Sequence, residues 1–503
     1  MIAVGKLNES YLQVSCERHI AYELNEYFAF KVPNAQFHPK VRARMWDGKI
    51  RLFNMQTGQM YLGLYPYLQE WAEKHSYRIQ TDIIQAKKLS GLDVEGIREF
   101  FDSLNLHCKK KPIEPRDYQI ASFLHCAKAE RALLLSPTSS GKSLVIYSLI
   151  RWHQQFLDND KILILVPTTN LVTQMYNDFK DYSSEQSEWN VEKQCHIIYS
   201  GREKEAEQQI YISTWQSLFR LGKPYFKQFG MVIGDEAHLC NAQSLKGILE
   251  KMTNCRYRFG TTGTITDSKT NKLVLEGLFG RTFTAITSKQ LMKDKHISEL
   301  QIKCLRLKYK PEECELNKKA TYQEEIDFVV THKRRNKFIC DLALARKGNV
   351  LVLFNFVEKH GKVLKDMMER KMAINEVAGK SYPRNIFFIA GETSVEDRES
   401  IRQVTEVENS IIVASSGVLS TGVNIKNLQT LIFAHPYKGK IRNLQSIGRV
   451  LRLDDKNNKA VLFDIVDDLI YKKHQNYGIK HWEQRVSTYL SEKFNYHCEQ
   501  ITL

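Results

Sequence analysis

The sequence lacks several features that would set it apart from ordinary globular enzymes. No apolar run approaches the roughly 18–20 residues of a membrane-spanning helix, and the N-terminus has no long apolar segment typical of secretory signals. The 10 cysteines include no C-x-x-C pair and the histidines show no metal spacing, so neither a zinc site nor a disulfide framework is expected. Scattered thiols are typical of a reducing compartment, and we expect a cytoplasmic protein without a membrane partner.

Internal repeats and low-complexity segments are also absent. The 503 residues, of which 43% are hydrophobic, suggest roughly three domains with buried cores. Positive charge is in excess, because Lys and Arg number 73 against 57 Asp and Glu, a net charge of +16. This surplus favours a polyanionic partner such as a nucleic acid, although it says nothing about the fold.

Two series of short apolar runs alternate with amphipathic stretches between about residues 113 and 465. Nearly continuous apolar strands separated by helices are typical of parallel sheets covered on both faces, so the sequence predicts two α/β lobes. The expected strands are 132–136, 162–167, 211–214, 231–235 and 258–262 in the first lobe, and 350–356, 386–390, 410–415, 430–434 and 461–466 in the second.

Smaller parts are predicted around these lobes. The first 90 residues carry hairpin signals and many aromatic residues, which indicates a small α+β domain. A connecting helix is expected to end in the basic run KKK before Pro112, and the C-terminal tail is expected to be helical. The predicted parts are 1–90 (N-terminal domain), 91–112 (connecting helix or linker), 113–300 (first lobe), 301–465 (second lobe) and 466–503 (helical extension).

The octapeptide SPTSSGKS, residues 136–143, lies between a predicted strand and a predicted helix. A helix that starts at Gly141 after a turn of small residues points backbone N–H groups and its positive end at an anion. The ammonium group of Lys142 would then reach the β- and γ-phosphates of a nucleotide, and the hydroxyl of Ser143 would reach Mg²⁺. The alternative is a capped helix start with an incidental lysine.

A pair of carboxylates favours the nucleotide interpretation. The segment MVIGDEAH, 231–238, ends a predicted buried strand with Asp235 and Glu236. A metal–nucleotide site needs one carboxylate to hold Mg²⁺, here Asp235, and another to take a proton from the attacking water, here Glu236. The alternative, a solvated acidic turn, is harder to reconcile with a phosphate loop on an earlier strand.

Together these motifs resemble those of the superfamily 2 helicases and translocases, in particular the DEAH-type members. In that family the phosphate loop needs no glycine at its first position, so Ser136 is compatible with it, whereas Ser139 stands where the family usually has glycine. The resemblance implies two RecA-like lobes that bind ATP and Mg²⁺. The implied phosphate-loop residues are Pro137, Thr138, Ser139, Ser140, Gly141, Lys142 and Ser143.

Further motifs follow in the family's order. RDYQ (116–119) resembles the adenine-reading motif, VPTTNLVTQ (166–174) and STWQSL (213–218) resemble loops that hold a nucleic-acid backbone, and TTGT (261–264) resembles the motif that couples hydrolysis to strand movement. The residues that the resemblance implies for the nucleotide are Arg116 and Gln119, and those for nucleic acid are Thr168, Thr169, Thr214 and Gln216.

In the second lobe, LFNF (353–356) and STGVNI (420–425) resemble strand-end motifs that face the cleft between the lobes. The resemblance implies nucleotide contacts for Gly422 and Asn424. Asn424 stands where the family commonly carries Asp, so it can accept a hydrogen bond there without a charge.

The segment QSIGRVLR, 445–452, resembles the family's arginine-finger motif. Arg449 and Arg452 are three residues apart, so on a helix they share a face. The resemblance implies that they meet the γ-phosphate together with Gln445, a role that contributes roughly 10³–10⁵ in rate in related hydrolases. The alternative is two arginines on a solvated face.

The segment KVRARMWDGKIRLF, 40–53, contains Asp47-Gly48, a strong signal for a two-residue hairpin. Pairing across this turn would set Arg44 opposite Arg51, which costs some tenths of a kcal/mol unless phosphates neutralise both charges. We therefore interpret the outer face as a nucleic-acid contact, and the alternative is a solvated face. The predicted contact residues are Lys40, Arg42, Arg44, Lys49 and Arg51.

The combined pattern predicts an ATP-dependent DNA helicase or translocase that acts as a monomer on duplex, single-stranded and branched DNA. The N-terminal MWDGKIRLFN ahead of the core resembles the recombination helicases of the family. That likeness implies remodelling of R-loops, four-way junctions and stalled forks, with RNA–DNA hybrids among the substrates. Two alternatives stay open: a DEAH-type RNA helicase, and a non-catalytic nucleic-acid clamp whose conformation ATP sets.

Overall fold

A computed structural model divides the chain into two units, Met1–Ile286 and Thr287–Leu503. None of the helices it describes combines the length and hydrophobicity that crossing a membrane requires. The described residues are 1–32, 35–82, 94–137, 140–157, 159–199, 203–237, 244–263, 269–294, 299–379, 384–391, 393, 397, 400–401, 403–405, 408–417, 428–437, 459–491 and 494–503.

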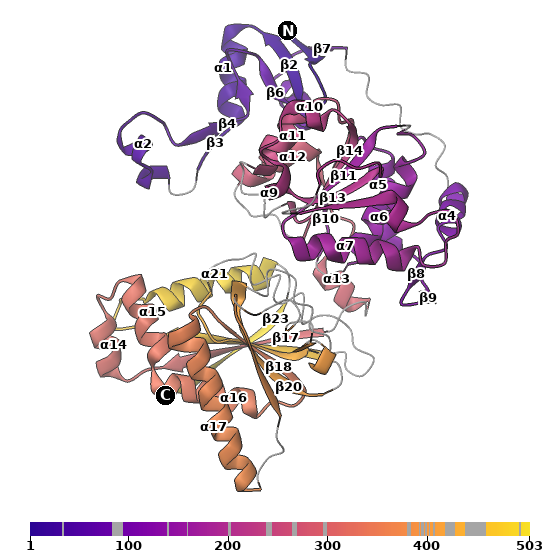
Figure 1. Cartoon of the computed structure of the whole chain (residues 1–503). Coiled ribbons are helices and arrows are strands. Elements are labelled where there is room, and N and C mark those ends of the chain that lie inside the picture. The colour runs from indigo at the N-terminus through magenta and orange to yellow at the C-terminus, as the bar shows by residue number, and fades with distance from the viewer. Residues whose placement is uncertain are drawn as a thin grey trace. The chain divides into compact units, whose positions relative to one another are not determined.

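The first unit begins with the predicted small α+β domain (Figure 1). Its sheet has the order β5-β6-β2-β1-β7, in which only β1 and β7 run parallel. Buried residues of both long helices belong to the same hydrophobic core as the sheet. The elements are β1 (Ile2–Lys6), β2 (Tyr11–Cys16), α1 (Arg18–Tyr27), β5 (Phe53–Asn54), β6 (Gln59–Tyr61), α3 (Tyr65–Lys74) and β7 (Ile79–Thr81).

The hairpin predicted around Asp47-Gly48 is wrong. Pro39 opens a helical turn, α2 (Pro39–Arg42), in which His38 accepts a hydrogen bond from the N–H of Lys40, so this stretch cannot extend as a strand. Asp47-Gly48 does form a turn, but it leads from α2 into β4 (Lys49–Arg51), which pairs with β3 (Ala29–Lys31). Arg51 therefore lies opposite Ala29 and not Arg44.

Residues 35–48, between β3 and β4, form an arm with α2 at its far end (Figure 1). Ion pairs stabilise the base of the arm. Glu26 contacts Lys49 at 2.5 Å and Arg51 at 3.1 Å. Arg51 also contacts Asp47 at 2.6 Å. The Trp46 indole N–H donates to the carbonyl of Lys49 at 2.8 Å. The arm is thus an ordered projection of the N-terminal domain.

The connecting helix ends earlier than predicted. It is α4 (Val94–Ser103). The basic run KKK belongs to a small hairpin, β8 (His107–Cys108) and β9 (Lys111–Pro112), and its first two lysines form the turn. Lys109 and Lys110 both have positive φ angles, 52° and 62°. The N–H of Lys109 donates to the Asp181 carboxylate, so a tertiary contact holds a turn where the sequence pattern predicted a helix end.

The first lobe is a seven-stranded parallel sheet in the order β12-β13-β11-β14-β15-β10-β16. All five strands predicted from apolar runs are present, and β12 and β16 at the two edges are additional. The strands are β10 (Arg131–Leu135), β11 (Lys161–Val166), β12 (Cys195–Ile198), β13 (Ile210–Thr214), β14 (Phe229–Gly234), β15 (Tyr257–Thr262) and β16 (Thr282–Phe283). The helices are α5 (Asp117–Ala127), α6 (Lys142–His153), α7 (Thr169–Tyr182), α8 (Val191–Gln194), α9 (Trp215–Leu218), α10 (Lys223–Phe226), α11 (Ser244–Lys251) and α12 (Lys269–Phe279).

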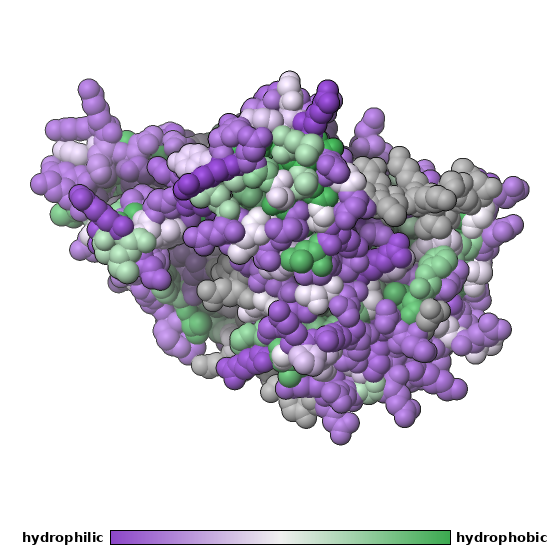
Figure 2. All heavy atoms as spheres, turned by 90° about the horizontal axis from the view of Figure 1, so that it is seen from above, coloured by the Kyte–Doolittle hydropathy of each residue, from purple (hydrophilic) through white to green (hydrophobic). Residues whose placement is uncertain are grey.

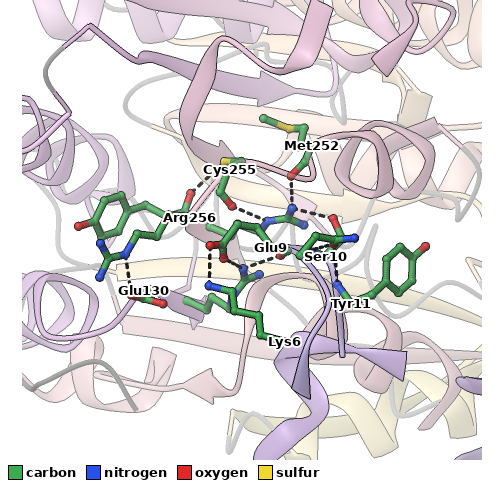
Figure 3. A network of polar contacts seen from close by, with 12 residues as sticks. Lys6, Glu9, Ser10, Tyr11, Glu130, Met252, Cys255 and Arg256 are labelled. Carbon is green, nitrogen blue, oxygen red and sulfur yellow. Dashed lines mark hydrogen bonds and ion pairs between the residues drawn. The ribbon is translucent and has the colours of Figure 1, made fainter. Parts of the chain in front are cut away.

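The N-terminal domain and the first lobe are joined by one hydrophobic core and by buried polar contacts. Fully buried Arg258, on β15, donates to the hydroxyl of Ser10 at 2.8 Å and to three backbone carbonyls, those of Leu249, Met252 and Cys255. Ser10, Met252 and Cys255 are labelled in Figure 3. A buried cation requires hydrogen-bond acceptors around it. The Arg258 guanidinium therefore links the two parts across the seam between them.

A second guanidinium at the seam belongs to Arg131, on β10. It contacts the Glu9 carboxylate of the N-terminal domain at 2.9 Å and the Glu9 carbonyl at 2.5 Å. Lys6 contacts the same carboxylate at 2.5 Å (Figure 3).

The second unit is also built on a seven-stranded parallel sheet, in the order β19-β20-β18-β21-β22-β17-β23. The five predicted strands are present again. The strands are β17 (Glu299–Lys308), β18 (Asn349–Phe354), β19 (Asn385–Ile389), β20 (Ser410–Ser415), β21 (Leu428–Phe433), β22 (Lys459–Asp468) and β23 (Asn495–Thr502). The helices include α13 (Ser288–Lys293), α14 (Pro311–Asn317), α15 (Tyr322–Thr331), α16 (Lys333–Leu344), α17 (Val363–Val377) and α21 (Tyr477–Ser491).

The tail contains the predicted helix, α21, but it ends in a strand that the sequence pattern did not predict. β23 is an edge strand of mainly exposed polar residues, paired in parallel with β17 along eight residues. The face of the molecule seen in Figure 2 is mostly hydrophilic, with hydrophobic residues in small separate patches. Because the sequence of β23 has no apolar run, its strand conformation follows only from its pairing with β17 at the edge of the sheet.

Candidate nucleotide site and nucleic-acid groove

The phosphate loop leaves the carboxyl end of β10 and enters α6 at Gly141. The N–H of Ser136 donates to the carbonyl of Thr262 at 2.9 Å, which continues the sheet into the loop. Gly141 has a φ of 78°, and a Cβ atom there would lie 2.2 Å from the side-chain nitrogen of Gln119. The loop therefore requires glycine at this position for both backbone and space. Thr138 and Ser139 lie outside the described residues.

Gln119, on α5, lies behind this loop and is buried. Its amide nitrogen donates to the carbonyl of Ser140 at 3.0 Å, and its amide oxygen accepts from the N–H of Arg116 at 2.9 Å. The side chain thus fixes the loop backbone to the start of α5. The adenine-reading role suggested for Arg116 and Gln119 stays a prediction.

The two predicted carboxylates directly follow β14, next to the loop. Asp235 is buried, and its carboxylate accepts hydrogen bonds from the hydroxyl of Thr261 and from the N–H of Glu236. Burial and the adjacent charge of Glu236 raise the pKa of Asp235 above its usual range. Glu236 has a φ of 50°, a left-handed backbone conformation that costs about 1–3 kcal/mol in a residue other than glycine. Such strain is typical of functional positions.

Lys142 connects the loop to the carboxylates. Its ammonium nitrogen lies 3.4 Å from a carboxylate oxygen of Glu236 and 3.4 Å from the carbonyl of Ser136. The structure therefore brings Lys142, Asp235 and Glu236 together at the carboxyl edge of the first sheet, where ligands bind in open parallel sheets.

The donor set at this edge fits Mg²⁺ bound together with a nucleotide. In the described part of the chain, no three His, Cys, Asp or Glu side chains gather closely enough to hold a metal ion. Mg²⁺ in nucleotide sites needs fewer, because water and phosphate oxygens complete its octahedron. Asp235 beside Glu236, and Ser143 beside Lys142 at the start of α6, are suitable oxygen donors.

A groove of about 670 Å³ opens at the carboxyl ends of β11, β12 and β13. It is lined by all four residues that the resemblance implied for nucleic-acid binding: Thr168, Thr169, Thr214 and Gln216. Thr168 caps α7, the hydroxyl of Thr214 pairs with that of Ser217 at 2.8 Å, and the Gln216 amide donates to the carbonyl of Pro167 at 3.3 Å. Three separate loops thus contribute to one groove.

The same groove contains side chains that the sequence analysis missed. Lys204 and Arg220 add two positive charges to its lining, and Tyr199 and Phe219 add aromatic surface. Arg220 is the second residue after the STWQSL motif, so its position after a nucleic-acid loop was a usable signal. Lys204 carried no such signal, because it follows an edge strand that the pattern did not reveal.

The five predicted arm residues divide into two groups. Lys40, Arg42 and Arg44 are exposed, whereas Lys49 and Arg51 form the ion pairs at the base of the arm. Two large apolar side chains on the arm are also exposed, Phe37 by 62% and Met45 by 77%.

In the second unit, the predicted residues Gly422, Asn424, Gln445, Arg449 and Arg452 lie outside the described residues. The described strands β20 and β21 come before and after Gly422 and Asn424 in the chain. Directly after β20, the Ser416 hydroxyl donates to the side chain of Asn355, which directly follows β18.

Comparison with known proteins agrees with this architecture. Family models match three stretches: "DNA helicase UvsW, N-terminal" at residues 2–82, "Type III restriction enzyme, res subunit" at 112–267 and "Helicase conserved C-terminal domain" at 334–454. The chain is 34% identical to the ATP-dependent DNA helicase uvsW of Enterobacteria phage T4, over 98% of both chains. It is 25% identical to a DNA 3'-5' translocase, XPB2, of Sulfurisphaera tokodaii, over 74% of this chain and 86% of that protein. The crystal structure of T4 UvsW superposes with a TM-score of 0.52 at 32% identity, covering 100% of this chain and 99% of that one.

The fold, the lobe-one site and these matches define the chain as an ATP-dependent DNA helicase of superfamily 2. Within that superfamily it belongs to the UvsW family, with which it shares the N-terminal domain as well as both lobes.

Proposed function

We propose that this helicase remodels branched DNA, namely R-loops, four-way junctions and stalled forks, in recombination, repair and replication. The proposal rests on the association of an ATP site, a nucleic-acid groove and a basic arm in one unit of the chain. In this proposal the groove holds one strand, and the arm contacts a second part of the substrate. This combination suits DNA that contains more than one duplex.

In this proposal the residues around the phosphate loop bind and hydrolyse ATP. Lys142 leaves its contact with Glu236 to meet the β- and γ-phosphates, and Glu236 is then available to accept a proton from the attacking water. Asp235 and Ser143 would hold Mg²⁺, which would supply positive charge for the phosphate oxygens. Arg449 and Arg452, with Gln445, stabilise the γ-phosphate from the second lobe, and Gly422 and Asn424 contact the nucleotide from the same lobe.

The groove and the arm bind DNA by different chemistry. Hydroxyl and amide groups of Thr168, Thr169, Thr214 and Gln216 suit backbone phosphates. The exposed basic residues of the arm add salt-dependent attraction to a duplex, and its exposed apolar side chains suit contact with bases at a junction.

A charge-reversal pair tests the arm. The triple variant Lys40→Glu, Arg42→Glu and Arg44→Glu is expected to weaken binding to a four-way junction at least tenfold and to reduce its salt dependence, while ATP hydrolysis without DNA is unchanged. The control is reversal of three exposed lysines of the β8–β9 hairpin, which makes the same change in net charge elsewhere in the unit. The control residues are Lys109, Lys110 and Lys111. Equal losses in both variants would count against a specific role of the arm.

Strand displacement tests the activity itself. ATP-driven unwinding of fork, four-way junction and RNA–DNA hybrid substrates is expected to exceed unwinding of RNA duplexes, and Lys142→Ala should abolish turnover and unwinding of all of them. Preference for RNA duplexes would favour an RNA helicase. If the wild-type protein bound ATP and released DNA without hydrolysing ATP, the result would favour the non-catalytic nucleic-acid clamp.

A further inference from the structure

Two fully buried arginines of the second unit bind the backbone at the end of β21. The first is Arg335, on α16, whose guanidinium contacts both carboxylate oxygens of Asp467 on β22, at 2.6 and 3.0 Å. The same guanidinium donates to the backbone carbonyl of Ala434 at 2.7 Å. The hydroxyl of Tyr309 donates to Asp467 at 2.8 Å and orients this carboxylate.

The second arginine repeats this arrangement from a different helix. Arg485, on α21, contacts both carboxylate oxygens of Asp464, also on β22, at 2.9 Å each. Its remaining nitrogen donates to the carbonyl of Tyr437 at 2.7 Å. The hydroxyl of Tyr489 donates to Asp464 at 2.9 Å, the counterpart of the tyrosine at the first pair.

Between these contacts the backbone from Ala434 to Tyr437 is held at both ends. The N–H of Ala434 also donates to the carbonyl of Leu353 on β18 at 3.1 Å. The imidazole of His435 belongs to this held segment, and its ring lies 5.5 Å from those of Phe356 and Tyr437. The two arginines, their aspartates and His435 are nearly inaccessible to solvent, so they cannot contact nucleic acid or nucleotide themselves.

Stability alone does not account for two such pairs. Hydrophobic residues of similar size commonly replace buried ion pairs without loss of stability, because desolvation offsets the attraction between the charges. What a guanidinium adds is a rigid fork that binds a carboxylate and one specific carbonyl at the same time. The guanidinium groups of Arg335 and Arg485 each hold one backbone carbonyl after β21, so together they fix where the chain leaves the sheet.

The residues that follow Tyr437 lead to Gln445, Arg449 and Arg452. We propose that Arg335 and Arg485 are positioning residues for ATP hydrolysis: they fix the departure point of the segment that carries the arginine pair. The inference rests on the proposed function of that pair. Neither residue touches ATP, so each acts on the chemical step only through the backbone that it holds.

Conservative substitutions test this inference in the full-length protein. Arg485→Lys and Arg335→Lys keep a positive charge beside Asp464 and Asp467, but an ammonium group cannot bind the carboxylate in a fork and also reach the carbonyl. Each variant is expected to lower kcat of DNA-stimulated ATP hydrolysis 10- to 100-fold, with KM for ATP changed less than threefold. Equilibrium binding of a fluorescent ATP analogue to the Lys142 site should be unchanged.

The matched control is Arg384→Lys. Arg384 donates to the backbone carbonyls of Arg346 and Gly348, at the opposite, amino edge of the same sheet. It is expected to alter the melting temperature by about as much as the other two substitutions but to leave kcat intact. A normal kcat in folded Arg485→Lys and Arg335→Lys, or an equal loss in Arg384→Lys, would overturn the inference.

A double variant separates this inference from the proposed function. In an Arg449→Ala background, adding Arg485→Lys is expected to change kcat by less than threefold, because both substitutions act on the same contact. If Arg449→Ala and Arg452→Ala each leave kcat intact, the proposed role of the arginine pair itself fails. If they abolish turnover while Arg485→Lys multiplies the residual loss tenfold, the positioning role alone fails.

Discussion

Neutralising Glu9 at the seam between the N-terminal domain and the first lobe should destabilise the first unit strongly. Two buried guanidinium groups, those of Arg131 and Arg258, lie at this seam, and Glu9 is the carboxylate that contacts Arg131. Arg258 is bound by Ser10 and by backbone carbonyls. In Glu9→Gln the side chain keeps its size and loses its charge, so the buried cation of Arg131 loses its counter-charge.

The expected magnitude follows from burial. The side chains of Arg131 and Glu9 are 10% and 16% exposed, so the pair belongs with buried rather than surface ion pairs. Removing one partner of a buried pair costs about 3–5 kcal/mol. We take about 3 kcal/mol, because glutamine can still accept a hydrogen bond. A domain of this size loses about 2–4 °C of melting temperature per kcal/mol, so the expected decrease is roughly 6–12 °C.

Thermal unfolding followed by tryptophan fluorescence is a suitable assay, because five of the six tryptophans lie in the first unit and only Trp482 lies in the second. The matched control is Lys6→Met, which removes the more exposed cation on the same carboxylate and should cost less than about 1 kcal/mol. Adding Arg131→Met to Glu9→Gln should recover at least about 1 kcal/mol, since the uncompensated cation is then gone. Equal effects of Glu9→Gln and Lys6→Met, or strictly additive losses in the double variant, would refute this reasoning.

Three further outcomes are expected. Gly141→Ala should weaken binding of a fluorescent ATP analogue at least tenfold, because the methyl group meets Gln119 and a positive φ costs about 1–2 kcal/mol; unchanged affinity would contradict the loop geometry. Asp235→Asn should raise the melting temperature of the nucleotide-free protein while DNA-stimulated hydrolysis falls at least 100-fold, because burial and Glu236 make the charged carboxylate costly; a lower melting temperature would argue against this. Burial and two neighbouring guanidinium groups lower the pKa of His435 to about 3, so below pH 6.5 the unfolded chain binds a proton that the folded protein does not. The free energy of unfolding should therefore fall by up to about 1.4 kcal/mol per pH unit between about pH 6.5 and 3. When urea unfolding is measured across that range, the free energy should fall less steeply in His435→Asn than in the wild type. Identical slopes in the two proteins would count against a neutral buried imidazole.

The sequence predicted the parts of the fold that local pattern controls. Ten apolar runs became strands of the two large sheets: nine lie in the interior of a sheet, and β19 lies at an edge. Interior strands are buried on both faces and are therefore apolar along their length. The interior strand β17 was not predicted. The association of Lys142, Asp235 and Glu236 was also predictable, since the carboxyl ends of parallel strands meet at one edge of a sheet.

Other elements depended on contacts that no local pattern records. β23 is polar and exposed, and its strand conformation comes from pairing with β17. The hairpin prediction failed at α2, because Pro39 started a helical turn and β4 found its partner in β3, earlier in the chain. Lys204 lines the groove beside residues that follow β11 and β13, and only the folded chain brings these positions together.

The sequence by itself determined the class of fold, the composition of the phosphate loop and the family, because these depend on periodicity and on short motifs. Tertiary structure decided which charges are available to a partner and which are used internally. Arg51, a predicted DNA contact, forms ion pairs with Glu26 and Asp47, while Arg258, Arg335 and Arg485 had no apparent role in the sequence and are buried at backbone carbonyls. The physical reason is that a guanidinium has the same composition in every setting, and only the folded surroundings determine whether water, a carboxylate or a carbonyl receives its hydrogen bonds.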